Sequence, residues 1–148
     1  MSGKRDAVLD EARARLGRGD YAGGERSLKK LLRSRPADAE GLYLLGALRL
    51  QEGKAAEAAS LMRRALDCGK PPDPAVLENL GTAYLVSGDS AAAERELRRA
   101  IAAGGTRSLL RMRLGMALAA LERFDEAEAM LRAAQQQDPH DADIGINL

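Results

Sequence analysis

Two side chains of this sequence, His140 and Cys68, are of the types that most often carry catalysis, and each is the only one of its kind. A general base needs a nucleophile or a carboxylate held at hydrogen-bond distance, and no recognisable motif supplies one to His140, which follows Pro139 in a polar stretch. Near the end of an expected helix, Cys68 fits a small half-buried residue better than a reactive thiol. The sequence therefore predicts no catalytic residues and a protein that is not an enzyme.

Metal and cofactor sites are not indicated by the sequence. One Cys and one His are too few soft ligands for a zinc site. The glycines at 17, 19 and 23 have a spacing near that of a phosphate-binding loop, but such a loop follows a strand, and no strand pattern precedes them. A turn between two helices explains these glycines. We expect no metal and no cofactor.

Pairs of basic residues recur along the chain as Lys29-Lys30, Arg63-Arg64 and Arg98-Arg99. Cations near the carboxyl ends of helices interact favourably with the helix dipole and keep an outer face solvated. Phosphate or RNA binding along this ridge is a weaker interpretation, because aromatic side chains for base stacking are missing there. The formal net charge of +1 gives no general attraction to polyanions. We predict that nucleic acid is not a partner.

Composition favours a helical globular domain. The chain has 148 residues, of which 45% are hydrophobic, 30% charged and only 3% aromatic, so its core must be built from closely packed Leu and Ala. A single cysteine excludes an internal disulfide and fits a reducing compartment. The first residues are charged and no apolar run approaches membrane-spanning length. We expect one cytoplasmic domain over residues 1–148, without membrane insertion.

The elements that position these residues are set by an internal repeat of 34 to 35 residues. Three columns keep this period independently, and they are Leu45-Gly46, Leu80-Gly81 and Leu114-Gly115; Gly19, Gly53, Gly88 and Glu122; and Gly24, Ala58, Ala93 and Ala127. Within each period the apolar residues follow helical spacing twice, with a break between. Each unit therefore predicts a helix, a tight turn and a second helix.

The four turns are predicted to need a left-handed residue. Gly19, Gly53 and Gly88 supply it at low cost, because glycine adopts a positive φ without steric clash. The fourth turn has Glu122 at the same phase. We expect backbone strain there.

The repeated pattern resembles that of the tetratricopeptide repeat family. The third unit carries it most fully, with Leu77, Leu80-Gly81, Tyr84, Ala93, Leu97 and Ala100, whereas the first has Glu11-Ala12 in place of Leu-Gly and Gly24 in place of the Ala. The resemblance implies an all-α, right-handed α-solenoid of about four helix-turn-helix repeats. We place them at about 5–38, 39–73, 74–107 and 108–141, with 142–148 as a capping helix or the start of a further repeat.

The repeated glycines have a packing explanation. A glycine inside a helix costs roughly 1 kcal/mol relative to alanine, so three at one phase indicate close helix approach. We expect Gly46, Gly81 and Gly115 to face Ala58, Ala93 and Ala127, and Met62, Leu97 and Leu131 to fill the space between successive units.

The resemblance also implies a binding groove, since the first helices of such repeats line a concave surface whose exposed positions select the ligand. Carried over to this chain, the groove residues are Leu9, Arg13, Tyr43, Ala47, Leu50, Glu78, Asn79, Thr82, Leu85, Met112, Arg113 and Met116. Their largely apolar character in the middle and at the far end suits an amphipathic helix or an extended apolar peptide. Packing against adjacent helices is the alternative explanation.

Two known specialisations of the family's groove are not matched. A clamp for a terminal carboxylate needs Lys, Asn and Arg at set positions, and neither register supplies the set. A ladder of groove asparagines is represented only by Asn79 and Asn147.

Three functional hypotheses follow. The first is a protein-interaction scaffold that binds a peptide or amphipathic helix of a partner protein. The second is the N-terminal, substrate-recruiting arm of a larger bacterial enzyme of glycosyltransferase or sulfotransferase type. The third is self-association through apolar end faces.

Overall fold

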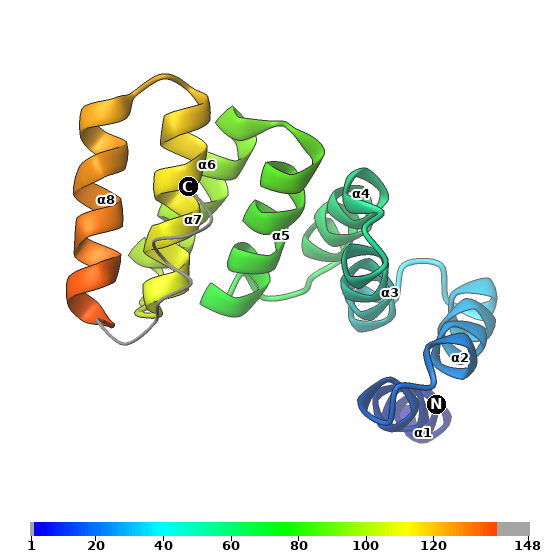
Figure 1. Cartoon of the computed structure of the whole chain (residues 1–148). Helices are drawn as coiled ribbons and strands as arrows, with labels where there is room; N and C mark the ends of the chain where they lie inside the picture. The colour runs from blue at the N-terminus through cyan, green and yellow to red at the C-terminus, as the bar shows by residue number, and fades with distance from the viewer. Residues whose placement is uncertain (1, 139–148) are drawn as a thin grey trace. The chain divides into compact units, whose positions relative to one another are not determined.

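The computed structural model describes residues 2–138, and these form eight helices and no strand. The helices are α1 (Ser2–Gly17), α2 (Tyr21–Ser34), α3 (Ala39–Gln51), α4 (Ala55–Asp67), α5 (Pro74–Ser87), α6 (Ser90–Ala102), α7 (Ser108–Ala120) and α8 (Phe124–Gln137), as Figure 1 shows. The predicted all-α repeat fold of solenoid class is confirmed. The expectations for Pro139, His140, Asn147 and segment 142–148 lie outside the described residues.

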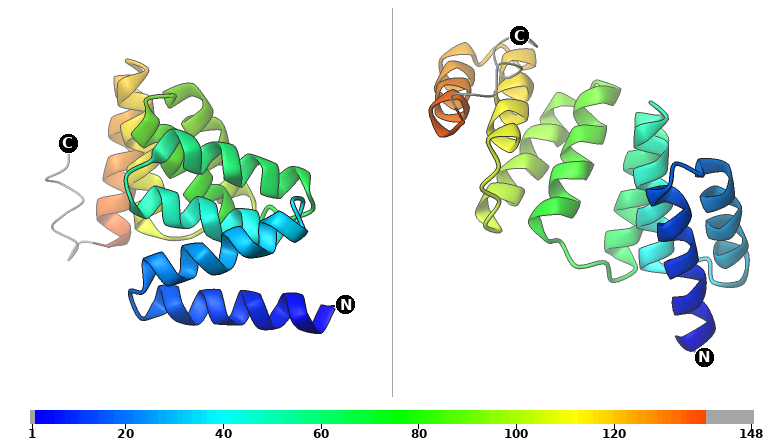
Figure 2. Two further views of the ribbon diagram at one scale, coloured as in Figure 1. Left: turned by 90° about the vertical axis from the view of Figure 1, so that its right-hand side faces the viewer. Right: turned by 60° about the horizontal axis from the view of Figure 1, so that its bottom comes forward.

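The chain divides into two compact units, Met1–Pro71 and Pro72–Leu148. In the first unit, α1 packs on α2 and α3 on α4, while α2 also contacts α3; in the second, α5 packs on α6 and α7 on α8, while α6 contacts α7. Figure 2 shows these helix pairs from two further directions. Each unit thus contains two helix pairs. That residues 1–148 form one domain stays a prediction.

Aspartates start half of the helices. Asp20, Asp38, Asp73 and Asp89 each precede a helix, and each carboxylate accepts a hydrogen bond from the backbone N–H three residues later. This N-cap satisfies a backbone donor that the helix itself cannot pair. The helices α4, α7 and α8 have no side-chain cap of this kind.

The expected left-handed turns are present. Gly19, Gly53 and Gly88 have φ values of 82°, 81° and 92°. Glu122 adopts the same conformation with a φ of 61° and is the only non-glycine residue with positive φ in the described chain. Since a side chain disfavours this region, the fourth turn carries the predicted strain.

The repeated glycines make the predicted close approach. A Cβ at Gly46 would lie 3.0 Å from Met62 Cγ and 3.2 Å from the Ala58 carbonyl oxygen. At Gly81 it would lie 2.7 Å from Leu97 Cγ, and Gly115 has the same relation to Leu131. The large side chains that we expected between units therefore lie directly over the glycine of their own pair.

The first pair reaches the same closeness with the two small residues exchanged. Ala12 occupies the phase of the repeated glycine and Gly24 that of the alanine. A Cβ at Gly24 would lie 2.6 Å from Leu16 Cδ2 and 3.6 Å from the Ala12 carbonyl oxygen. The first repeat, which looks degenerate in the sequence, therefore keeps the close approach of its two helices, with the glycine on the second helix instead of the first.

Leu and Ala build both cores, as the composition predicts. In the first unit, Leu9, Ala12 and Leu28 pack with leucines of α3. In the second, Leu97, Ala93 and leucines of α7 form the corresponding cluster. No helix among the described residues is both long enough and apolar enough to cross a membrane.

Candidate peptide-binding faces

The first helix of each pair carries the candidate binding residues. We define the first-unit face as Arg13 on α1 with Glu40, Tyr43, Ala47 and Leu50 on α3. The second-unit face consists of Asn79, Thr82 and Leu85 on α5 with Arg113 and Met116 on α7. The structure leaves the side chains of both faces exposed or half-buried.

Ion pairs tie the first-unit face together. Arg13 Nη2 lies 2.8 Å from Glu40 Oε1 and so links α1 to α3. Lys70 Nζ pairs with the other oxygen of Glu40. Burial opposes ionisation of Glu40, but the hydrogen bonds from Lys70 and Arg13 outweigh it and hold the pKa of Glu40 below its ordinary value. Glu40 is therefore a charged link between helices.

The same lysine positions the aromatic ring of this face. The ammonium group of Lys70 lies 4.7 Å from the centroid of the Tyr43 ring, a cation–π distance. One face of the ring is thereby covered. Tyr43, Ala47 and Leu50 are half-buried, so part of each side chain remains open to a ligand.

One predicted groove residue of the first unit is not exposed. Leu9 is only 2% exposed and belongs to the core of its unit. The helix turns its side chain toward the packed interior, so the prediction of an exposed position was wrong.

The second-unit face is also held by an ion pair. Arg113 Nη1 on α7 lies 2.7 Å from Glu78 Oε1 on α5, and Arg107 Nη1 lies 3.4 Å from the same oxygen. Burial lowers the pKa of Arg113, although its attraction to Glu78 acts in the opposite sense. Glu78 is 4% exposed, so this predicted groove residue is a buried link between helices.

Met112 is a further correction. It is 7% exposed and packs in a small apolar cluster with Ala134, partly covered by Leu109, Met116 and Leu131. Its partner position one turn on, Met116, remains half-buried. Met116 therefore replaces Met112 as the methionine that a ligand could reach.

The polar members of this face are partly engaged by the protein itself. The Thr82 hydroxyl donates to the Glu78 carbonyl oxygen at 2.8 Å, a bond within its own helix. Leu85 and Asn79 are half-buried. Thr82 therefore contributes a methyl group more than a free donor.

Sequence reasoning missed Lys70 and Arg107, which complete the two faces. Both follow a helix end in loops whose length varies, so the repeat phase did not point to them. In the sequence, only their positive charge could have indicated that they pair with Glu40 and Glu78.

The other chemistry-bearing residues do not form a site. Cys68 is exposed just after α4, which corrects the expectation of a half-buried residue. Among the residues that the structure describes, no three His, Cys, Asp or Glu side chains lie close enough together to hold a metal ion. Of the basic pairs, Arg98 and Arg99 are engaged by Glu94 and Glu96, which favours the solvated-face interpretation.

Comparisons with known proteins agree with this arrangement. Residues 9–74 and 78–142 match the family model described as tetratricopeptide repeat. Among curated proteins nothing matches.

Solved structures match the fold closely at low sequence identity. YrrB, described as a TPR protein with an unusual peptide-binding site, aligns with a TM-score of 0.83 and 23% identity over 93% of this chain and 70% of its own. A crystal structure of MamA gives a TM-score of 0.84 with 22% identity over 97% of this chain and 78% of its own. An O-GlcNAc transferase mutant from Thermobaculum terrenum gives 0.76 with 25% identity, and 92% of this chain covers 26% of that enzyme.

Proposed function

Because this chain belongs to the tetratricopeptide repeat family, we propose that it is a protein-interaction scaffold which binds a peptide or an amphipathic helix of a partner on its first-helix faces. The family and the fold support the scaffold role. The side chains of the two faces support a peptide or an amphipathic helix as the ligand.

The apolar positions held in place by ion pairs are the observation that carries this proposal. Tyr43 is fixed under Lys70, and Arg13 and Glu40 join the two helices that carry the first-unit face. A surface that is ordered before binding loses little conformational entropy on association. Half-buried Tyr, Leu and Met side chains offer apolar contact to one side of a helix or to alternate side chains of a strand.

The second-unit face supports the same ligand with different chemistry. The Glu78–Arg113 pair links α5 to α7, and Leu85 and Met116 lie on these same two helices. A thioether adapts to ligand shapes because it is unbranched and flexible. The peptide-binding site that YrrB's description records belongs to that protein, and it supports a similar role here.

A non-enzymatic role in a reducing cytoplasmic compartment is part of this proposal. It rests on the absence of a catalytic motif in the sequence and on the lone cysteine.

An alternative is the substrate-recruiting arm of a larger enzyme. The likeness to part of an O-GlcNAc transferase favours it, because this chain corresponds to about a quarter of that enzyme's chain. The reading frame of the gene discriminates between the two, since a catalytic domain in the same frame would support the enzyme arm.

The test of the scaffold proposal starts from peptide selection. A displayed library of random peptides is selected against the whole chain, and the affinity of the selected peptide is measured by fluorescence anisotropy. We expect Tyr43→Asp to weaken a peptide that binds the first-unit face, and Met116→Asp a peptide that binds the second-unit face, at least tenfold, because a charge would face the apolar side of the ligand. Circular dichroism verifies that helicity is retained.

Phe124→Asp is the matched control. Phe124 is 64% exposed at the start of α8 and lies outside both faces, so the same type of substitution should leave the affinity unchanged. Unchanged affinity in Tyr43→Asp and Met116→Asp, or equal loss in all three variants, would contradict the proposal.

A further inference from the structure

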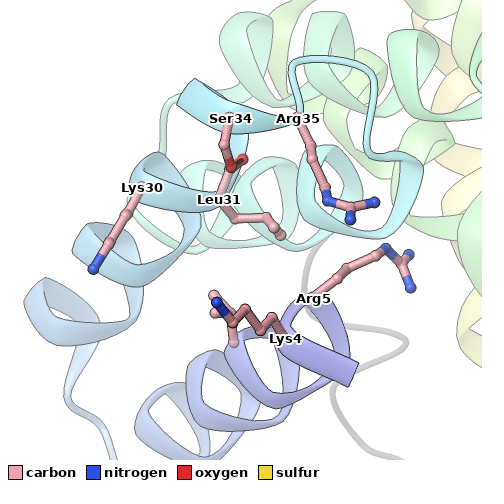
Figure 3. Close-up of a pocket in the computed structure, with 7 residues that line it drawn as sticks. Lys4, Arg5, Lys30, Leu31, Ser34 and Arg35 are labelled. Carbon is pink, nitrogen blue, oxygen red and sulfur yellow. Dashed lines mark hydrogen bonds between the residues drawn. The ribbon is translucent and has the colours of Figure 1, made fainter. Parts of the chain in front are cut away.

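A basic pocket with an apolar floor lies at the open end of the first helix pair, opposite its turn (Figure 3). It has a volume of about 340 Å³. Side chains from the start of α1 and the end of α2 line it, and Val8 and Leu31 supply its apolar carbon. The cations around it are Lys4, Arg5, Lys30 and Arg35.

Only one of the four cations is neutralised by a close partner. Arg5 pairs with Asp38 and, at 3.0 Å, with Asp6. In the part of the chain that the structure describes, Lys4, Lys30 and Arg35 form no salt bridge. Asp38 also attracts Arg35, so among the described residues Lys4 and Lys30 are the two cations of the pocket without a carboxylate partner.

Among the described residues, Lys4 and Lys30 form no ion pair that would stabilise the fold. The one hydroxyl in the lining, that of Ser34, donates to the Leu31 carbonyl oxygen at 3.0 Å. The cations repel one another, and a negatively charged ligand removes that repulsion. Charge complementarity thus indicates an anionic ligand.

The positions of the cations exclude a single small anion as the best fit. Figure 3 shows the ammonium group of Lys30 on one side of the pocket and the guanidinium groups of Arg5 and Arg35 together on the other. A phosphate or carboxylate ion binds best where several donors converge on one point. Here the charges are spread out and carbon lies between them.

Helix α2 beside the pocket is mainly basic, although the exposed Asp6 next to Arg5 is acidic. Helix α2 carries Arg26, Lys29, Lys30 and Arg33 but only one acidic residue, Glu25. A broad basic surface accelerates the approach of acidic partners and lengthens the region over which they are attracted.

We propose that this pocket is a second binding site, which takes an acidic linear segment of a partner protein and buries one large apolar side chain of that segment against Val8 and Leu31. Carboxylates before and after the apolar residue pair with Lys30 on one side and with Arg35 on the other. The site is separate from the first-helix faces, whose residues do not line it.

The probe is a fluorescein-labelled synthetic peptide, Asp-Glu-Phe-Asp-Glu with blocked ends, titrated with the whole chain at low salt. We expect saturable binding that Lys30→Glu weakens at least tenfold. Replacing the Phe of the peptide by Ala should weaken binding about tenfold as well, because the apolar floor then loses its contact. Tyr43→Asp should leave this binding unchanged, which separates it from the proposed function.

Arg33→Glu is the matched control for the pocket. Arg33 is exposed on the same helix but does not line the pocket, so the same charge reversal should have less than a twofold effect. Equal weakening by Arg33→Glu and Lys30→Glu would overturn the site in favour of general attraction to α2.

Two other outcomes would overturn the proposed occupant. Displacement of the peptide by an equal concentration of inorganic phosphate would identify a small-anion site. A doubling of the solution mass that Lys30→Glu abolishes would identify a second copy of the chain as the occupant.

Discussion

The two units differ in the sign of one buried ion that binds several partners. In the first unit Arg49 is buried, with a side chain that is 6% exposed, and the carboxylate of Asp38 is buried as well. In the second unit Glu96 is buried, with a side chain that is 0% exposed, and the carboxylate of Glu78 is buried as well. Each is covered by ions of the other sign, so both units satisfy the buried charge, but they do so with opposite arrangements.

In the first unit, carboxylates surround the arginine. Arg49 pairs with Glu25, with Glu57 at 3.0 Å and with Glu52 at 3.1 Å. Its hydrogen bond to Glu25 raises the pKa of Arg49 and lowers the pKa of Glu25 to about 2. The cluster joins α2, α3 and the start of α4.

In the second unit, arginines surround the glutamate. Arg95 and Arg99 lie 3.2 Å and 2.7 Å from Glu96, and both remain about half exposed. Long arginine side chains can pair with a buried carboxylate while keeping part of the guanidinium in water.

Total charge and local pairing together make the surface of the first unit basic. Residues 1–71 contain 15 Lys and Arg against 10 Asp and Glu, and residues 72–148 contain 8 against 12. The first unit engages three carboxylates around one buried arginine, and of the cations of α2 Lys30 and Arg33 form no salt bridge whereas Lys29 pairs with Glu25. In the second unit most arginines pair with glutamates.

We expect the largest loss of stability from removing the buried arginine of the first unit. Arg49→Met should lower the free energy of unfolding by about 3 kcal/mol, because three carboxylates then lose the buried cation that they share, and only Glu25 and Glu52 keep a lysine partner. Urea unfolding followed by circular dichroism measures the loss.

Glu96→Gln is the counterpart in the second unit. It should cost only about 1 kcal/mol, because Arg95 and Arg99 can turn into water once the carboxylate is gone. Equal losses in the two variants would mean that the sign of the buried ion makes no difference.

A smaller loss of stability is expected when the close helix contacts at glycine are disturbed, and it should differ between the two units. Gly81→Ala should lower the free energy of unfolding by about 2 kcal/mol, because its Cβ would meet Leu97, which is fully buried and cannot move. Gly24→Ala should cost less than about 1 kcal/mol, since Leu16 is half-buried and can rotate, and since alanine favours the helix. Urea unfolding compares the two variants, and the reverse order would contradict the packing argument.

A smaller effect is expected on the stability of the first unit at acidic pH. The folded-state pKa of Glu25 is about 2, below its value in the unfolded chain, so the stabilisation is complete at neutral pH and is lost as the pH falls from about 5 to 2. Glu25→Gln should lower the free energy of unfolding by roughly 1 kcal/mol at pH 7 and by nothing near pH 2.

Glu126→Gln serves as the control from the second unit. The hydrogen bond from Arg123 also lowers the pKa of Glu126, but this pair lies in solvent. We expect little change of stability with pH from this variant. A constant loss in Glu25→Gln from pH 7 to pH 2 would show that its ion pair with Arg49 does not act through charge.

The smallest effect concerns the turns. Glu122→Gly should raise the free energy of unfolding by about 0.5 kcal/mol, because it relieves the left-handed conformation of a residue with a side chain. The reciprocal variant Gly53→Glu in the first unit should lower it by about 1 kcal/mol. Thermal unfolding measures both, and a loss in Glu122→Gly would contradict the interpretation of strain.

The sequence by itself determined the repeat, the helix pairs, the left-handed turns and the contact of Gly81 with the second helix of its pair. These features are local, because helical periodicity and turn chemistry act within about 35 residues and leave a fixed phase in the chain. The sequence could also show which residues stand on first helices. It could not show that Leu9, Glu78 and Met112 are buried or that Cys68 is exposed.

Only the tertiary structure decided how the charges are used. Arg49 and Glu96 are ordinary charged residues in the sequence, and their burial depends on the helices that cover them. The Lys70–Tyr43 contact and the basic pocket at Lys4 and Lys30 depend on long side chains from segments about 25 to 30 residues apart. Such side chains have many rotamers, and only the packed surroundings select the one in which a charge finds its partner or is left without one.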